Sequence, residues 1–295
     1  MNTASPAIAP HTREQPAVEG WWQRARQHPG FILGAMLTAL LLLAAGLSWV
    51  WTPHSVYEVN MDARLLPPDG TYWLGTDAYG RDVLSWLLVG ARASIQVGVI
   101  AVGIGLLIGT ALGLLAAARR GWVEELIMRM TDFGFAFPAI LSAIMLTAVY
   151  GPGLVNAIIA IGLYNIPTFA RITRAAARAV WSRDYVLAAR SCGKGAWRIS
   201  FEHVLPNIAA VLIVQTTIRF AVAILAEAAL SYLGLGTQPP QPSWGRMLAE
   251  AQTLMYDAPL LAVWPGLAIV LAVLGLNLLG DGLRDVLDPR LTQGR

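Results

Sequence analysis

Six long apolar segments constrain the fold of this chain more than any other feature of its sequence. They cover roughly residues 31–51, 94–118, 134–150, 154–170, 207–230 and 264–280. A helix rises about 1.5 Å per residue, so about 20 apolar residues cross a hydrocarbon core of about 30 Å. Only 13% of the residues are charged, whereas soluble domains have about 25%. The sequence therefore predicts an all-α polytopic membrane protein with six transmembrane helices.

The first apolar segment is predicted to remain in the mature protein as a transmembrane helix. Its 21 uncharged residues exceed the apolar core of about 7–15 residues in a signal peptide, and no clear cleavage site follows. Gly-Pro-Gly at 151–153 separates the third and fourth segments and predicts a tight turn between two helices. Residues 1–20 are rich in Ala, Pro and polar residues and are predicted to be disordered.

Basic residues are distributed unevenly between the segments that connect the spans. With the N-terminus in the cytoplasm, 16 of the 21 Lys and Arg residues fall in cytoplasmic segments and four fall outside, while Arg219 lies within a span. Cytoplasmic loops carry the excess of Lys and Arg, so both termini are predicted to be cytoplasmic. Because the basic residues sit at span ends rather than in one patch, no nucleic-acid partner is expected despite the net charge of +3.

This topology divides the chain into three parts. Residues 1–30 are expected to form a cytoplasmic N-terminal tail. Residues 31–93 would hold the first transmembrane helix and a periplasmic segment. Residues 94–292 would form a core of five further helices.

No catalytic, cofactor or metal site is predicted. The four histidines are far apart in the sequence, and no pair of them has metal-ligand spacing. Gly-Lys-Gly at 193–195 lacks the glycine spacing and the following Ser or Thr of a phosphate-binding loop. The single cysteine, Cys192, is expected to be a small packed side chain. If the chain moves a solute against a gradient, the ATP chemistry must lie on another chain.

A polar stretch with the sequence DYVLAARSCGKGAWRISFEHVLPN, residues 184–207, interrupts the oily part of the chain. Gly193 and Gly195 predict a bend between two short helices, because glycine destabilises a helix interior. From Trp197, apolar residues at offsets of four, seven and eight form one helical face. Arg198 lies four residues before Glu202 and is expected to pair with it. Pro206 suits the first turn of the next span. These patterns alone leave two interpretations open, an amphipathic surface linker or a docking element.

Two further stretches carry recognisable patterns. In WLGTDAYGRDVLSWLLVGARAS, residues 73–94, Thr76 or Asp77 is expected to cap an interfacial helix that leads into the second span. Arg219 and Glu227 are ionisable residues in or near the fifth span, and a charge at the bilayer centre costs about 2.5–3.5 kcal/mol. They could line a route for a zwitterionic peptide, or they could pair with a neighbouring subunit; both alternatives stay open.

The polar stretch resembles the cytoplasmic loop of ABC importer permeases. That loop reads Glu-Ala-Ala, three residues, Gly, then eleven residues to Leu-Pro, and this chain has the matching residues Ala188, Ala189, Gly193, Leu205 and Pro206. Leu187 stands where the family usually has glutamate. Residues 73–94, 226–248 and 277–291 resemble the dipeptide/oligopeptide/nickel permease subfamily, in the subunit type with a long outer segment.

The resemblance implies a type I ABC importer permease of the bacterial inner membrane. A coupling helix at about 184–200 would dock on an ATPase through a loop that includes Tyr185, Ala188, Ala189, Gly193, Arg198, Leu205 and Pro206. The implied partners are a second permease chain, two ATPases that bind ATP and Mg²⁺, an external binding protein and the lipid bilayer.

The expected cargo is a di- or oligopeptide, and a nickel chelate is the alternative. An ion-coupled secondary transporter is a weaker alternative. Such proteins show repeats and buried acidic residues in their spans, and here no repeat is visible and Glu227 is the one candidate acid.

Overall fold

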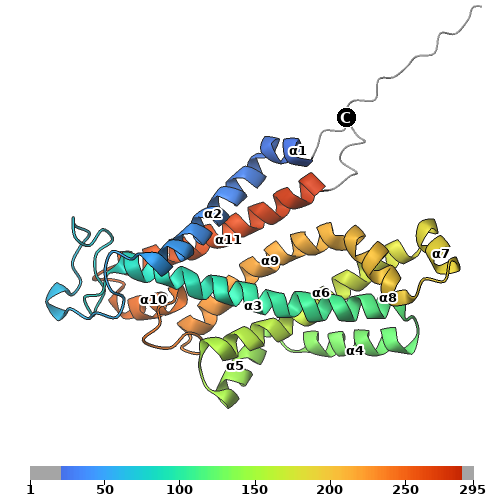
Figure 1. Ribbon diagram of the computed structural model, residues 1–295. Helices are drawn as coiled ribbons and strands as arrows, with labels where there is room; N and C mark the ends of the chain where they lie inside the picture. The colour runs from blue at the N-terminus through green and yellow to red at the C-terminus, as the bar shows by residue number, and fades with distance from the viewer. Residues whose placement is uncertain (1–20, 288–295) are drawn as a thin grey trace, which may run out of the picture.

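The computed structural model describes residues 21–287 (Figure 1). The tail expected at 1–20 and the charged residues after 287 lie outside the described residues. Within this range the chain is helical, and pairing of extended backbone is confined to an isolated bridge between Thr76 and Asp82. The elements are α1 Trp21–Gln27, α2 Pro29–Val50, η1 Met61–Ala63, α3 Val83–Ala118, α4 Trp122–Ala136, α5 Ala139–Tyr150, α6 Leu154–Trp181, α7 Asp184–Ser191, α8 Ala196–Ile199, η2 Ser200–Val204, α9 Leu205–Tyr232, α10 Trp244–Ala251, η3 Gln252–Leu254 and α11 Leu260–Leu287.

Five helices are long and apolar enough to cross a membrane, which confirms most of the expected spans. They are α2, α3, α6, the continuous helix from α8 to α9, and α11. A sixth span is present if α4 and α5 together count as one. The Gly-Pro-Gly turn lies where it was expected, because α5 ends at Tyr150 and α6 begins at Leu154.

The third span differs from the expectation of one helix over 134–150. The chain bends by 81° between α4 and α5, and α5 has only 12 residues. Pro138 explains the break, since a proline forces the preceding residue out of helical geometry. Phe137 is accordingly extended, with φ −101° and ψ 130°.

Small residues allow α3 and α6 to approach closely. Gly105, Gly109 and Gly113 recur every four residues along one face of α3. A Cβ added at Gly109 would lie 2.6 Å from the carbonyl oxygen of Ile166, and one at Gly113 would lie 2.6 Å from that of Ala170. Glycine is therefore required along this seam, as in tightly packed membrane helices generally.

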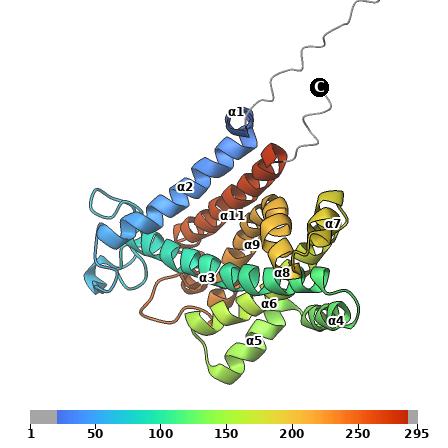
Figure 2. The same cartoon turned by 45° about the vertical axis from the view of Figure 1, so that its right-hand side comes forward.

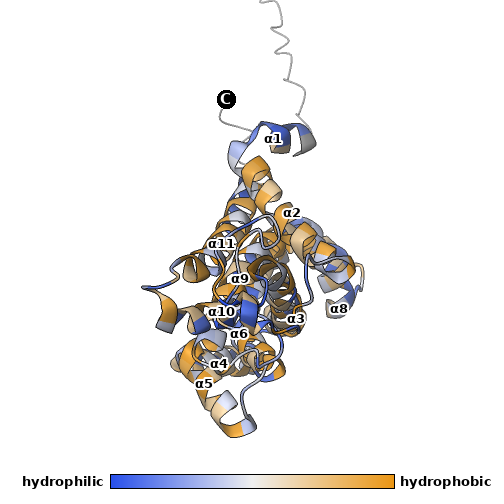
Figure 3. Cartoon of the chain, turned by 90° about the vertical axis from the view of Figure 1, so that its left-hand side faces the viewer, coloured by the Kyte–Doolittle hydropathy of each residue, from blue (hydrophilic) through white to orange (hydrophobic). Residues whose placement is uncertain are grey.

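A second helix pair, α2 and α11, packs beside this group and diverges from it toward α1 (Figures 1 and 2). Glycines again bring the backbones together, because a Cβ at Gly34 would lie 2.3 Å from the backbone nitrogen of Leu279. Figure 3 shows the hydrophobic colouring along α2 and α11 and the hydrophilic colouring of α1. The loop over 52–82 and α10 lie at one end of the bundle, and α7 and α8 lie at the other (Figure 1). These ends are called the α10 end and the α7 end below.

The segment before the second span folds differently from the interfacial helix expected at 73–94. Asp82, rather than Thr76 or Asp77, is the N-cap, and its carboxylate accepts hydrogen bonds from the Ser85 backbone N–H at 3.0 Å and hydroxyl at 2.5 Å. Gly75 and Gly80 have φ of +80° and +70°, which folds the residues before Asp82 into a turn. Helix α3 then runs unbroken across residue 93, so the expected division between 93 and 94 falls inside a helix.

Candidate functional site

The polar stretch forms two short helices at the α7 end of the bundle, as the glycines predicted. We call residues 184–204, which include α7, the bend, α8 and η2, the two-helix loop. Val186, Ile199 and Val204 are buried and pack into the main hydrophobic core, so the loop is seated firmly on the bundle. Cys192 at the end of α7 is exposed, so the expectation that it is packed was wrong.

The bend depends on Gly193. Its φ is +81°, a left-handed conformation that other residues adopt at a cost. Its N–H donates to the Arg190 carbonyl at 3.0 Å, and the Lys194 N–H donates to the Ala189 carbonyl at 3.2 Å. This pair of hydrogen bonds is the Schellman ending of a helix, which satisfies carbonyl groups that α7 would otherwise leave free.

The outward surface of the two-helix loop is apolar and aromatic. Tyr185, Leu187, Trp197 and Phe201 are each between 47% and 57% exposed, although a soluble surface seldom gathers such residues. Trp197 and Phe201 stack with ring centroids 6.2 Å apart. Ala188 is also exposed, whereas Ala189 is half-buried. The loop therefore exposes apolar and aromatic side chains from both α7 and the helix after the bend, as protein interfaces do.

Charged side chains brace the same loop. The predicted pair is present, with Arg198 Nε at 2.5 Å from Glu202 Oε1. Lys194 joins it from the bend, with Nζ at 2.6 Å from Glu202 Oε2 and 3.1 Å from His203 Nε2. The periodicity did not predict the contacts of Lys194 and His203, because both depend on how the bend folds back on η2.

A π-helical turn connects the two-helix loop to the fifth span. Within η2 the Leu205 N–H donates to the Ser200 carbonyl, five residues back. Pro206 is in the first turn of α9, as expected, and the Asn207 side-chain amide donates to the His203 carbonyl at 2.6 Å. Such turns occur mostly as single turns inside α-helices, and they are frequent at functional sites. Helices α8, η2 and α9 thus form one continuous helix from the loop into the bundle.

Arg219 and Glu227 occupy different environments on α9. Glu227 is fully buried, and its Oε1 accepts hydrogen bonds from Ser231 at 2.6 Å and Thr237 at 3.1 Å. Arg219 is half-buried, its Nε has no hydrogen-bond partner, and no acidic side chain among residues 21–287 pairs with it. The enclosure of Glu227 by its own chain favours a structural role, while the role of Arg219 in a pathway stays a prediction.

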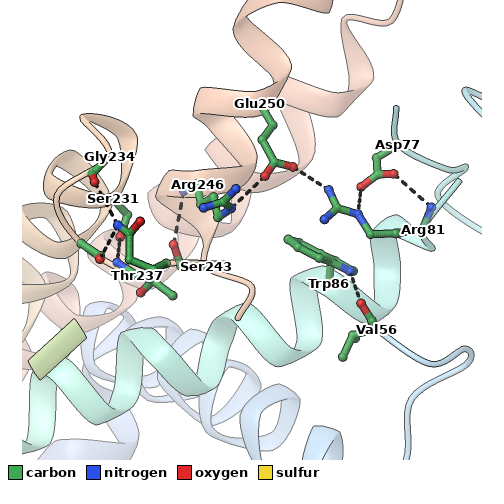
Figure 4. A network of polar contacts seen from close by, with 12 residues as sticks. Val56, Asp77, Arg81, Trp86, Ser231, Gly234, Thr237, Ser243, Arg246 and Glu250 are labelled. Carbon is green, nitrogen blue, oxygen red and sulfur yellow. Dashed lines mark hydrogen bonds and ion pairs between the residues drawn. The ribbon is translucent and has the colours of Figure 1, made fainter. Parts of the chain in front are cut away.

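A polar network joins the outer segment to α10 at the α10 end (Figure 4). Arg81 contacts Asp77 at 2.5 Å and Glu250 at 2.6 Å, and Glu250 also binds Arg246 at 2.8 Å. The Arg81 guanidinium lies 3.7 Å from the centre of the Trp86 ring. Through Arg81, the Gly-Arg-Asp pattern at 80–82 therefore holds the loop over 52–82 against α3 and α10.

Comparison with known proteins agrees with this architecture. Residues 109–293 match the family described as the inner membrane component of binding-protein-dependent transport systems. The chain belongs to this family. It is thus a multi-pass inner membrane protein and a permease component, which is not itself the catalytic part of such systems.

Full-length relatives of this permease share two fifths or more of its residues. It is 41% identical over 291 residues to the glutathione transport system permease protein of Pectobacterium atrosepticum, covering 99% of this chain and 97% of that protein. It is 40% identical over 294 residues to the dipeptide transport system permease protein of Alkalihalophilus pseudofirmus, covering 99% and 97%. It is 44% identical over 294 residues to the di/tripeptide transport system permease protein of Pseudomonas aeruginosa, covering 97% of each.

The fold of this permease also resembles a solved transporter. The inward-facing MetNI methionine ABC transporter aligns with a TM-score of 0.57 at 18% identity, covering 69% of this chain and 97% of that chain. This likeness confirms the expected fold of an ABC importer permease, and at this identity it carries the fold alone.

Proposed function

We propose that this permease is one of the two membrane subunits of an ATP-driven importer for di- or oligopeptides. The observation that carries the proposal is its similarity, over the full length, to permeases named for dipeptide, di/tripeptide and glutathione transport. A second permease chain, two ATPases that bind ATP and Mg²⁺, and an external binding protein would complete the transporter.

The two-helix loop is proposed as the docking element for an ATPase. Its exposed apolar side chains and its glycine bend suit insertion into a cleft of another protein. The proposed contact residues include Tyr185, Ala188 and Arg198, while Ala189 is half-buried beneath them. Leu187 is 49% exposed, so an apolar side chain replaces the usual glutamate directly on the proposed contact surface.

Continuity from α8 to α9 suggests how docking would reach the membrane. A displacement of the loop by the ATPases would be transmitted to α9, because the helix is unbroken from Ala196 to Tyr232. Buried Val204 and half-buried Leu205 tie the start of α9 to the core, and Pro206 marks its first turn. Alternating access would follow, with the α7 end in the cytoplasm and the α10 end facing the binding protein.

Reconstitution tests this proposal. The permease with its partner chains is placed in proteoliposomes, and uptake of a labelled dipeptide delivered by the binding protein is followed. Uptake should require hydrolysable ATP and both ATPases, and a matched sample with a non-hydrolysable analogue should show none. Uptake by the permease alone, driven by an ion gradient without ATP, would refute the proposal.

A further inference from the structure

Three polar side chains on α6 and α9 make no side-chain hydrogen bond or ion pair within the described chain. Arg219 on α9 makes no hydrogen bond or ion pair with any residue from 21 to 287, and its Nε is occluded from solvent. The phenol of Tyr164 on α6 lies close enough to interact with Arg219 electrostatically. Asn165, next to Tyr164, is only 2% exposed, yet none of the hydrogen bonds among these residues involves its side-chain amide.

Tyr164 and Asn165 border a pocket between α5, α6 and α9, and Arg219 lies next to its lining on α9. Tyr164 and Asn165 line it from α6, and Val222 and Ala226 line it from α9. Arg219 lies three and seven residues before those two, on the same face of the helix. The pocket is small, with a cavity volume of about 50 Å³, and the rest of its wall is apolar. An apolar cavity with a few convergent polar groups is typical of a small-molecule site.

The charge of Arg219 has no anion beside it among the described residues. Arg92, another arginine on a membrane helix, is satisfied within its own chain, because its Nε donates to the Ser48 hydroxyl at 2.6 Å and its guanidinium lies 4.5 Å from the centre of the Trp49 ring. An uncompensated guanidinium inside a membrane is expensive and marks a functional site by default. Its planar donors match a carboxylate, and the Tyr164 hydroxyl and Asn165 amide add donors beside it.

We propose that Arg219, Tyr164 and Asn165 form a transient site for the C-terminal carboxylate of the transported peptide. This inference rests on the proposed function, and it assigns the peptide's anionic end to this chain. The cationic end is assigned elsewhere, because Glu227 is fully buried. The side-chain amide of Asn165 can also form a hydrogen bond with a peptide bond of the substrate. The apolar wall of the pocket can accept varied side chains.

The test compares one labelled dipeptide with its C-terminal amide in proteoliposomes that contain the complete transporter. Both probes are supplied at concentrations that saturate the binding protein, as checked by its own titration. Wild type should move the free-acid peptide roughly tenfold faster or more, since a charge-assisted hydrogen bond is lost with the amide. Arg219→Gln should abolish this preference by slowing the free acid, and Arg219→Lys should keep part of it.

Arg92→Gln is the matched control, because it removes a membrane arginine that already has partners in its own chain. It should leave the preference for the free acid intact. Asn165→Leu should slow the free acid more than the amide and so weaken the preference. If Arg219→Gln slows both probes equally or lowers the yield of assembled transporter, the counter-charge belongs to a partner subunit and the inference is wrong. Absence of ATP-dependent uptake of either probe by wild type would refute the proposed function itself.

Discussion

Replacing Gly193 by alanine should uncouple ATP hydrolysis from transport, whereas the same change at Gly195 should not. The two glycines flank Lys194 in the same bend, both are exposed, and a Cβ at either position would meet nothing within 4 Å. Steric conflict with the rest of the chain is therefore excluded at both sites. They differ in backbone conformation, since φ is +81° at Gly193 and −67° at Gly195.

The magnitude follows from that difference. A side chain in the left-handed region costs about 1–2 kcal/mol, which lowers the population of the native bend by a factor of about 5–30. At Gly195 the backbone is extended, and alanine gains about 0.4–1 kcal/mol because the unfolded chain loses freedom. Gly195 is also the N-cap of α8, where alanine is less suited than glycine, so the net effect should be near zero.

Two measurements on the reconstituted transporter check this prediction. The first is the number of ATP molecules hydrolysed per peptide imported, which should rise for Gly193→Ala and stay at the wild-type value for Gly195→Ala. The second is hydrogen exchange over 184–204, which should quicken only in the Gly193 variant. Equal behaviour of the two variants in both assays would show that the left-handed bend does not carry the coupling.

Three further predictions concern the bundle and its outer end. Gly109→Leu should lower the yield of monodisperse protein in size-exclusion chromatography, because its Cβ would lie 2.6 Å from an α6 carbonyl oxygen; Gly103→Leu, with nothing within 4 Å, should not, and equal loss would contradict the close seam. Arg81→Gln should quicken proteolysis of residues 52–82, whereas exposed Arg64→Gln should leave the cleavage rate unchanged. Ser231→Ala should destabilise the permease by about 1.5–3 kcal/mol through loss of a hydrogen bond to a buried carboxylate, and an unchanged thermal melt would count against this role.

Local patterns predicted the features that depend on local chemistry. Apolar length is enough to find α2, α3, α6 and α11, since the bilayer sets the length of a span. The glycine bend was predictable because only glycine adopts φ of +81° readily. Pro138 is a local signal for the break between α4 and α5. The apolar residues on both sides of it nevertheless favoured one span over 134–150.

Features that depend on distant contacts could not be predicted in the same way. Thr76, Asp77 and Asp82 are all acceptable helix caps, and the turn that selects Asp82 relies on Thr76 bonding to the Ala63 carbonyl at 2.5 Å. Thr237 reaches Glu227 only because the chain turns back after α9. The unpaired amide of Asn165 is invisible in the sequence, where one asparagine in a span has no marked environment.

The π-helical turn fixes how the two ends of one helix are oriented about its axis. Each residue of an α-helix turns the chain by about 100° about the helix axis. In η2 the backbone hydrogen bond spans five residues instead of four, so this turn contains one inserted residue. Deleting one residue inside 200–204 would convert that turn into an ordinary α-helical turn. The Arg219 side chain would then still point in roughly the same direction about the helix axis, toward Tyr164. Deleting one residue between Leu205 and Arg219 would swing the guanidinium by about 100° away from Tyr164. The tolerance of this helix to length changes should therefore be confined to a single turn.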